Sequence, residues 1–201
     1  MRTASSTIKL LSLLSVAAAV GCSPEHESVI TQPPAPTVSF NQGDGVLYSV
    51  NGGGIVNFST AGVGNGWFSF NAVKKADGSV VGRFHQRRDT PAGLVEFSGI
   101  VTCLTIDAAR MRGRIGGTVT ENNSTNPNFL TANHEVGDDV WFRFADGGEG
   151  GDAVDASTTY GFKPTLVNTS AEYCALPFDG LPAWNPATTF PLLTGNIQIR
   201  P

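Results

Sequence analysis

The sequence predicts an all-β fold, an antiparallel meander of short strands. From Gly43 onward, short apolar runs alternate with glycine-rich turns, and no long stretch sustains a 3.6-residue apolar period. The composition agrees, because 24 glycines and only 15% charged residues in 201 are unlike a coiled coil or a charged disordered chain. We therefore expect about eight or nine strands, forming a small barrel or a sandwich.

Turn residues divide the domain into its expected elements. Asp77-Gly78 is the strongest hairpin-turn signal, and a second turn is expected over residues 89–93. Long connections over residues 121–139, 146–165 and 174–195 interrupt the meander, and such loops are functional or mobile. The strands are expected over residues 46–50, 55–58, 67–73, 79–87, 94–106, 109–120, 140–145 and 196–200.

Alternation of residue types assigns the two faces of these strands. In the run over residues 109–120, Arg110, Arg112 and Arg114 fall on one face, and Met111 and Ile115 on the other. We expect one buried face and one face in water, as in antiparallel sheets. The glycines in this run predict bends or bulges and therefore strong curvature.

The N-terminus precedes the domain with a signal and a linker. Arg2 and Lys9 precede an apolar run over residues 10–20. This run is shorter than the ~20 residues that a membrane-spanning helix needs. A charged start, a short apolar run and small residues after it are typical of a secretory signal. We assign residues 1–21 to a signal peptide, residues 22–42 to a proline-rich flexible linker, and residues 43–201 to the β-rich domain.

The end of the signal, Ala19-Val20-Gly21-Cys22, resembles the lipobox of bacterial lipoproteins. The resemblance implies cleavage before Cys22, diacylation of its thiol and acylation of the new N-terminus, as with palmitate. Two or three acyl chains anchor a protein stably, so the implied location is the bacterial cell envelope, with the membrane as partner. The alternative is an ordinary secreted protein. A net charge of −4 and a pI of about 5.3 give no basis for nucleic-acid binding.

Two cysteines remain after lipidation, Cys103 and Cys174. An even pair in an oxidising compartment predicts a disulfide bond. Two buried free thiols or a metal pair are the alternatives, and the sequence has no CxxC motif to favour a metal.

An acidic, glycine-rich segment follows the strand expected over residues 140–145. Residues 147–155 fit the calcium-binding nonapeptide GGxGxDxUx, but only one copy is present, whereas that motif works by stacking copies. Calcium could still be held by carboxylates and glycine carbonyls. The alternative is a flexible acidic loop. The candidate ligands are Asp146, Glu149, Asp152 and Asp155.

Basic and histidine-containing segments supply further candidates. Arg83, His85 and Arg87 share one strand face, where they could bind an anionic ligand together with the arginines of residues 110–114. The alternative is a solvated face in which Glu96 pairs with them. His134-Glu135 with Asp138-Asp139 could form a metal or acid–base cluster, without the HExxH spacing. Aromatic residues in the third long connection are expected to cap one end of the core: Phe178, Trp184 and Phe190.

Short segments at residues 97–104, 115–117, 140–144, 146–150 and 195–199 resemble a group of uncharacterised secreted bacterial β-rich proteins. The resemblance covers roughly residues 50–200 and implies export and a β fold, with no activity attached. No GxSxG, P-loop or GxGxxG motif is present in a fitting context. We therefore expect a non-enzymatic binding or structural domain. The alternatives are a calycin-like small-ligand carrier, a calcium-stabilised module, or an envelope hydrolase that uses His85 or His134.

Overall fold

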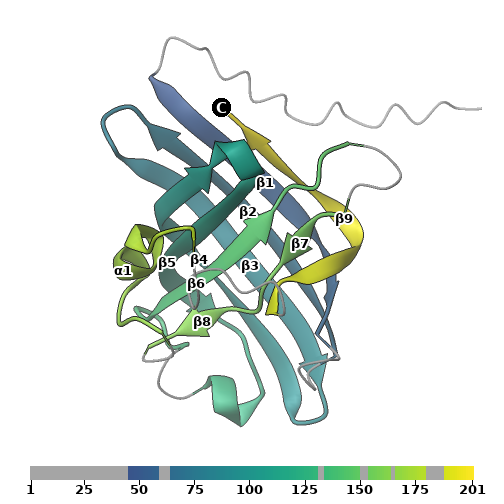
Figure 1. Cartoon of the computed structure of the whole chain (residues 1–201). Coiled ribbons are helices and arrows are strands. Elements are labelled where there is room, and N and C mark those ends of the chain that lie inside the picture. The colour runs from purple at the N-terminus through teal and green to yellow at the C-terminus, as the bar shows by residue number, and fades with distance from the viewer. Residues whose placement is uncertain (1–44, 59–63, 131–133, 150–153, 164–165, 180–187) are drawn as a thin grey trace, which may run out of the picture. The chain divides into compact units, whose positions relative to one another are not determined.

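An antiparallel sheet makes up most of the part of the chain that the structure describes (Figure 1). The computed structural model describes residues 45–58, 64–130, 134–149, 154–163, 166–179 and 188–201. The expected signal peptide and the whole linker, including Cys22, lie outside these ranges. No helix within them is long and apolar enough to cross a membrane.

Nine strands and one short α-helix are present in the described ranges. Two single-turn 3-10 helices, at Ala108–Arg110 and Pro127–Phe129, connect strands. The strands are β1 (Val46–Asn57), β2 (Asn65–Lys75), β3 (Val80–Thr90), β4 (Gly93–Asp107), β5 (Arg112–Asn122), β6 (Asp139–Ala145), β7 (Ala156–Ser157), β8 (Gly161–Phe162) and β9 (Phe190–Arg200), and the helix is α1 (Ser170–Ala175).

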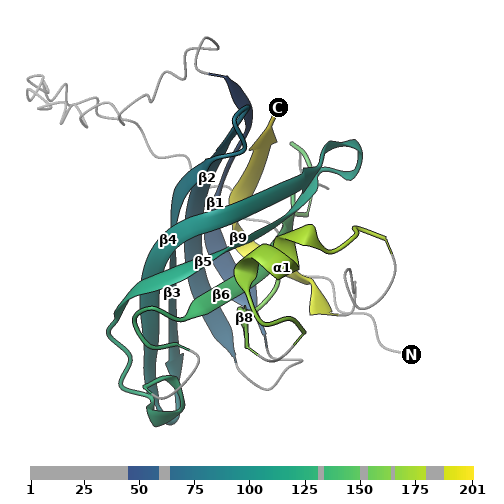
Figure 2. The ribbon, with the colours of Figure 1, turned by 90° about the vertical axis from the view of Figure 1, so that its left-hand side faces the viewer.

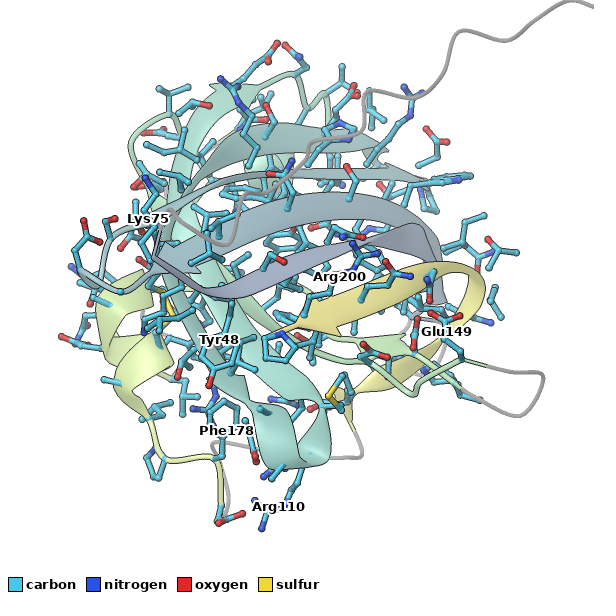
Figure 3. All side chains as sticks on the ribbon, turned by 90° about the horizontal axis from the view of Figure 1, so that it is seen from above. Tyr48, Lys75, Arg110, Glu149, Phe178 and Arg200 are labelled. Carbon is cyan, nitrogen blue, oxygen red and sulfur yellow. A yellow bond between two sulfur atoms is a disulfide. The ribbon has the colours of Figure 1, made fainter. Side chains whose placement is uncertain are left out.

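Eight of the strands follow one another in a ring. Their order is β5-β4-β3-β2-β1-β9-β7-β6, and β6 pairs again with β5. The ring stops short of a regular barrel, because β7 contributes only two residues to the junction with β9. β8 adds to β6 outside the ring order. The all-β antiparallel prediction is confirmed, and Figure 3 looks into this ring from the end where Tyr48, Lys75 and Arg200 lie.

Glycines opposite phenylalanines explain how the ring interior packs. Gly52 pairs with Phe70, Gly99 with Phe84, and Gly113 with Phe144. A Cβ atom at each glycine would lie within 2.7 Å of the ring of its partner. The glycines therefore make room for aromatic rings that fold over them, and the phenylalanines build the core.

Several elements differ from the expectation. The strand expected over residues 109–120 begins only at Arg112, because Ala108–Arg110 forms a 3-10 helix. The runs at residues 46–50 and 55–58 form one strand, since β1 keeps its register with β2 through Gly52–Gly54. β9 begins at Phe190, six residues earlier than expected, because it pairs with β7. β7, β8 and α1 lie within connections that carry no clear period, because their pairing partners are remote in sequence.

A disulfide between Cys103 and Cys174 joins α1 to β4, as predicted. The side chain of Asp139 accepts hydrogen bonds from the backbone N–H and the hydroxyl of Ser170, which also fix the start of α1. α1 therefore lies on the outer side of β4 and β5 (Figure 2).

The cover by α1 corrects the prediction of a solvated arginine face on β5. Alternation places Arg114 correctly on the outer side, yet Arg114 is 0% exposed. Its guanidinium donates to the carbonyls of Leu176 and Pro177 and lies over the ring of Phe178. The alternation of a strand assigns a side chain to a face but does not reveal what covers that face.

Candidate functional site

The two ends of the ring interior differ in chemistry. Near Phe70 and Phe144 the interior is filled by aromatic rings in contact with one another. At the opposite end, β3 turns Gln86 and Arg88 inward, because they continue the inner-face series that begins at Phe84. We call this second region the polar end.

A loop after β5 brings further side chains to the polar end. The side chain of Asn122 donates hydrogen bonds to the carbonyls of Phe129 and His134, at 2.7 Å each. The amide oxygen of Asn126 accepts from Asn128 N–H and caps the 3-10 helix that carries Phe129. The imidazole of His134 consequently packs against the rings of Phe129 and Phe162, with centroids 4.5 and 4.8 Å away.

The segment between β7 and β8 completes the polar end. Tyr160 extends into the ring interior, where its ring contacts those of Phe84, Phe97 and Phe142. Its neighbour Gly161 lies against the indole of Trp141, and a Cβ there would lie 2.4 Å from Nε1. Only a residue without a side chain lets this segment approach β6 and direct Tyr160 inward.

A cavity of about 210 Å³ lies among these groups. Three polar atoms at its borders are buried without a hydrogen-bond partner among the described residues: Arg88 Nε, His134 Nδ1 and the Tyr160 hydroxyl. Such atoms are rare in native proteins, because an unpaired buried group loses its hydration without compensation. The described residues that line the cavity are Gln86, Arg88, Phe129, His134, Thr159, Tyr160 and Phe162.

Burial dominates the electrostatics of the polar end. Arg88 is 6% exposed, and burial lowers the pKa of its guanidinium. Burial lowers the pKa of His134 to about 4, with an opposing effect of Asp138 and a further lowering by Arg88. Burial also raises the pKa of Tyr160. At neutral pH the cavity therefore contains a cation, a neutral imidazole and a protonated phenol.

The predicted anion-binding residues lie outside the ring. Arg83, His85 and Arg87 share the outer face of β3, as the alternation predicts. The His85 Nε2 atom lies 3.2 Å from Glu96 Oε1, and Arg87 lies 3.8 Å from the same oxygen. A surface cavity of about 280 Å³ borders His85 together with Ser69 and Ser98. Arg112 belongs to a separate group, with Asp107 and Asp179.

The predicted calcium ligands lie beside β9. Asp146 accepts a hydrogen bond from Ile199 N–H, and Asp155 accepts one from Ile197 N–H. These carboxylates thus take the place of a neighbouring strand where β7 is too short to pair with β9. Glu149 accepts from Gln198, and Figure 3 shows it beside that strand. Asp152 lies outside the described residues, and no group of three or more candidate metal ligands occurs within them.

The predicted cluster of His134, Glu135, Asp138 and Asp139 does not converge on one site, although Asp138 lies near enough to His134 to act on its pKa. His134 turns into the polar end, whereas Asp139 binds Ser170, and Asp138 accepts from the backbone N–H of Glu135. Among the expected aromatic caps, Phe190 packs edge-on against Phe58, and Phe178 lies over the guanidinium of Arg114. Trp184 lies outside the described residues.

Sequence reasoning missed Arg88 and Tyr160 as site residues. The signal for Arg88 was available, because the alternation that places Arg87 outside places Arg88 in the core, where an unpaired charge is unusual. Tyr160 had no such signal, since it lies in a loop without a hydrophobic period.

Comparison of the chain with protein-family models, curated proteins and solved structures finds no match.

Proposed function

We propose that this protein is a lipid-anchored protein of the bacterial cell envelope whose β domain binds a small ligand at the polar end without transforming it. The observation that carries the binding role is the cavity with three unpaired buried polar atoms. Buried polar groups without partners cost stability, and a bound ligand that pairs with them would compensate that cost.

The geometry of the ring supports a tethered binding domain. The linker enters at Val46, which pairs with Lys75 at the end of β2. Arg88 lies near the other end of the ring, close to the turn between β3 and β4. In Figure 1 these two ends are the upper and lower ends of the sheet. The cavity thus lies away from the end of the ring at which β1 begins, which supports a domain tethered through its N-terminus.

Lipidation is tested by metabolic labelling with an alkyne-bearing palmitate in a bacterial host. We expect label on the full chain and none on a Cys22→Ser variant, which keeps the signal but has no thiol to acylate. Equal labelling of both would contradict the anchor.

Binding is tested separately, by a rise in thermal midpoint of the full chain with millimolar benzamide or benzoate. No rise with either probe would contradict the binding role.

An envelope hydrolase is the second candidate, favoured by the contact between His85 and Glu96 beside a surface cavity. A histidine oriented by a carboxylate is the arrangement of a general base. The side chain of His85 is 43% exposed on an open sheet face, however, and that position does not exclude water. Hydrolysis of p-nitrophenyl acetate that a His85→Ala variant loses, and a His26→Ala variant keeps, would favour the hydrolase over the binding domain.

A further inference from the structure

We infer that the ligand of the polar end is a small monoanion that presents a carboxylate to Arg88. The inference rests on the proposed function, because it names the chemical class of the ligand that the binding domain takes. It starts from the least compensated charge in the ring interior.

Within the described ranges, Arg88 has no counter-charge. Its side chain is 6% exposed, its Nε is buried without a hydrogen-bond partner, and its one aromatic contact there is with Phe129, whose ring centroid is 5.6 Å from Cζ. None of the ion pairs in those ranges includes Arg88. A buried cation without a partner destabilises the folded state. An anion that enters the cavity removes this cost, whereas a neutral ligand leaves it.

The charge of the site selects a monoanion. Of the described residues around the cavity, Arg88 is the one cation at neutral pH, since His134 is neutral there. One negative charge is therefore balanced, and a second charge, as on a phosphate dianion, has no partner. The planar fork of a guanidinium matches the two oxygens of a carboxylate. The hydroxyl of Tyr160 adds a donor that has no hydrogen-bond partner among the described residues.

The walls and the volume select a small, flat ligand. Phe129, Phe162 and the imidazole of His134 present aromatic surfaces around the cavity. Its volume of about 210 Å³ lies below the roughly 300–1,000 Å³ of sites for drug-sized molecules. Benzoate is both small and flat, and benzamide is its uncharged counterpart of nearly identical shape.

The test measures binding of benzoate, benzamide and inorganic phosphate to the full chain in detergent by isothermal titration calorimetry. We expect benzoate to bind roughly tenfold or more tightly than benzamide, because hydrogen bonds between charged groups are the stronger ones. We expect phosphate to bind more weakly than benzoate. Equal binding of benzoate and benzamide would overturn the inference and leave the binding function standing. Binding of neither would overturn both, and tighter binding of phosphate would overturn the monocarboxylate class.

Variants locate the site. Arg88→Gln is expected to abolish the preference for benzoate, and Tyr160→Phe, which removes only a hydroxyl, to weaken benzoate binding several-fold. Arg200→Gln removes an exposed arginine at the far end of the ring and is expected to change nothing. Loss of benzoate binding in Arg83→Gln, with retention in Arg88→Gln, would overturn the inference by placing the anion on the outer face. Circular dichroism spectra confirm that each variant folds.

Discussion

Two buried arginines, Arg114 and Arg88, show how differently one protein treats the same side chain. Both are almost inaccessible to water, and burial lowers the pKa of each. Arg114 donates to two backbone carbonyls and lies over Phe178, with its centroid 4.6 Å from Cζ. In the part of the chain that the structure describes, Arg88 has only an aromatic contact, with Phe129. The first arginine holds two segments together, whereas the second has donor capacity that the protein does not use.

The difference follows from what covers each arginine. The outer side of β5 is covered by α1 and the residues after it, whose free carbonyls need donors. The polar end is covered by aromatic rings, which offer a guanidinium only their faces. The Nε of both arginines is buried without a hydrogen-bond partner, so the difference lies in the terminal nitrogens. Those of Arg114 donate to the protein and indicate architecture, whereas those of Arg88 make no hydrogen bond in the described ranges and indicate a site that awaits a partner. The following changes test this distinction, beginning with the largest expected effect.

Removal of the disulfide should loosen the cover over Arg114 and spare the polar end. For Cys103→Ser with Cys174→Ser, we expect a loss of ~4 kcal/mol in the free energy of unfolding, since the bond closes a long loop in the unfolded chain. Urea denaturation measures this, with the oxidised wild-type protein as reference and the reduced wild-type protein as a control that should match the variant. Affinity for benzoate should stay unchanged. A loss under ~1 kcal/mol would mean that α1 is held mainly by the contact of Ser170 with Asp139.

Substitution of Arg114 by Met should destabilise the protein by about 2–4 kcal/mol, because the carbonyls of Leu176 and Pro177 then lose their charged donor. Arg110→Met is the control. Arg110 lies in an exposed ion-pair group with Asp107 and Asp179, and such exposed pairs contribute little to stability, so this variant should unfold close to the wild type. Equal unfolding midpoints in urea for the two variants would show that Arg114 is not a structural link.

The sequence was most informative about local structure. The hairpin at Asp77-Gly78 was predictable because its cause is local: Asp77 accepts from the N–H and hydroxyl of Ser79, and Gly78 takes a positive φ of 86°. The alternation in β3, and in β5 from Arg112 onward, likewise assigned side chains to the correct faces, whereas Arg110 lies in the 3-10 helix before β5. These features depend on residues a few positions apart.

The features that the sequence did not reveal depend on remote partners. Arg114 is buried because residues 170–178 fold over it, and no period near β5 encodes that cover. Asp146 and Asp155, which could be ligands for calcium by composition, accept N–H groups of β9 some 50 and 40 residues away. The polar end combines β3, the loop after β5 and Tyr160, so its composition is visible only after folding.

Protonation of His134 should destabilise the protein in acid. Its pKa is lowered from 6.5 to about 4 in the folded state, so the unfolded chain takes up the proton first as the pH falls. Its contribution is therefore complete above pH ~6.5 and is lost progressively down to pH ~4, with a total of ~3 kcal/mol. The groups that act on it are Arg88, which opposes protonation, and Asp138, which favours it.

A His134→Leu variant should lack this component of the pH dependence, because leucine takes up no proton. The measurement is the free energy of unfolding in urea at several pH values between 4 and 7, for the wild type and for two variants. His85→Leu, which removes the histidine on the outer face, is the control and should keep the slope. If all three proteins showed one slope, His134 would not be the group that titrates in this window.

The Arg88→Met substitution is expected to change the free energy of unfolding least, but whether it stabilises or destabilises the protein is the most informative result. Replacing Arg88 by Met removes a buried charge without a counter-charge and keeps an unbranched apolar stem in the core. We expect the ligand-free protein to gain ~1 kcal/mol, in line with other buried charges replaced by apolar residues, and to lose its preference for benzoate over benzamide. Thermal and urea unfolding give the sign of the change in stability, and the same substitution at Arg114 is expected to give the opposite sign.

A loss of stability on Arg88→Met would mean that the guanidinium has a partner in the ligand-free protein, and the contrast between the two arginines would then disappear. A gain together with lost anion binding is the pattern of a residue retained for binding at the expense of stability.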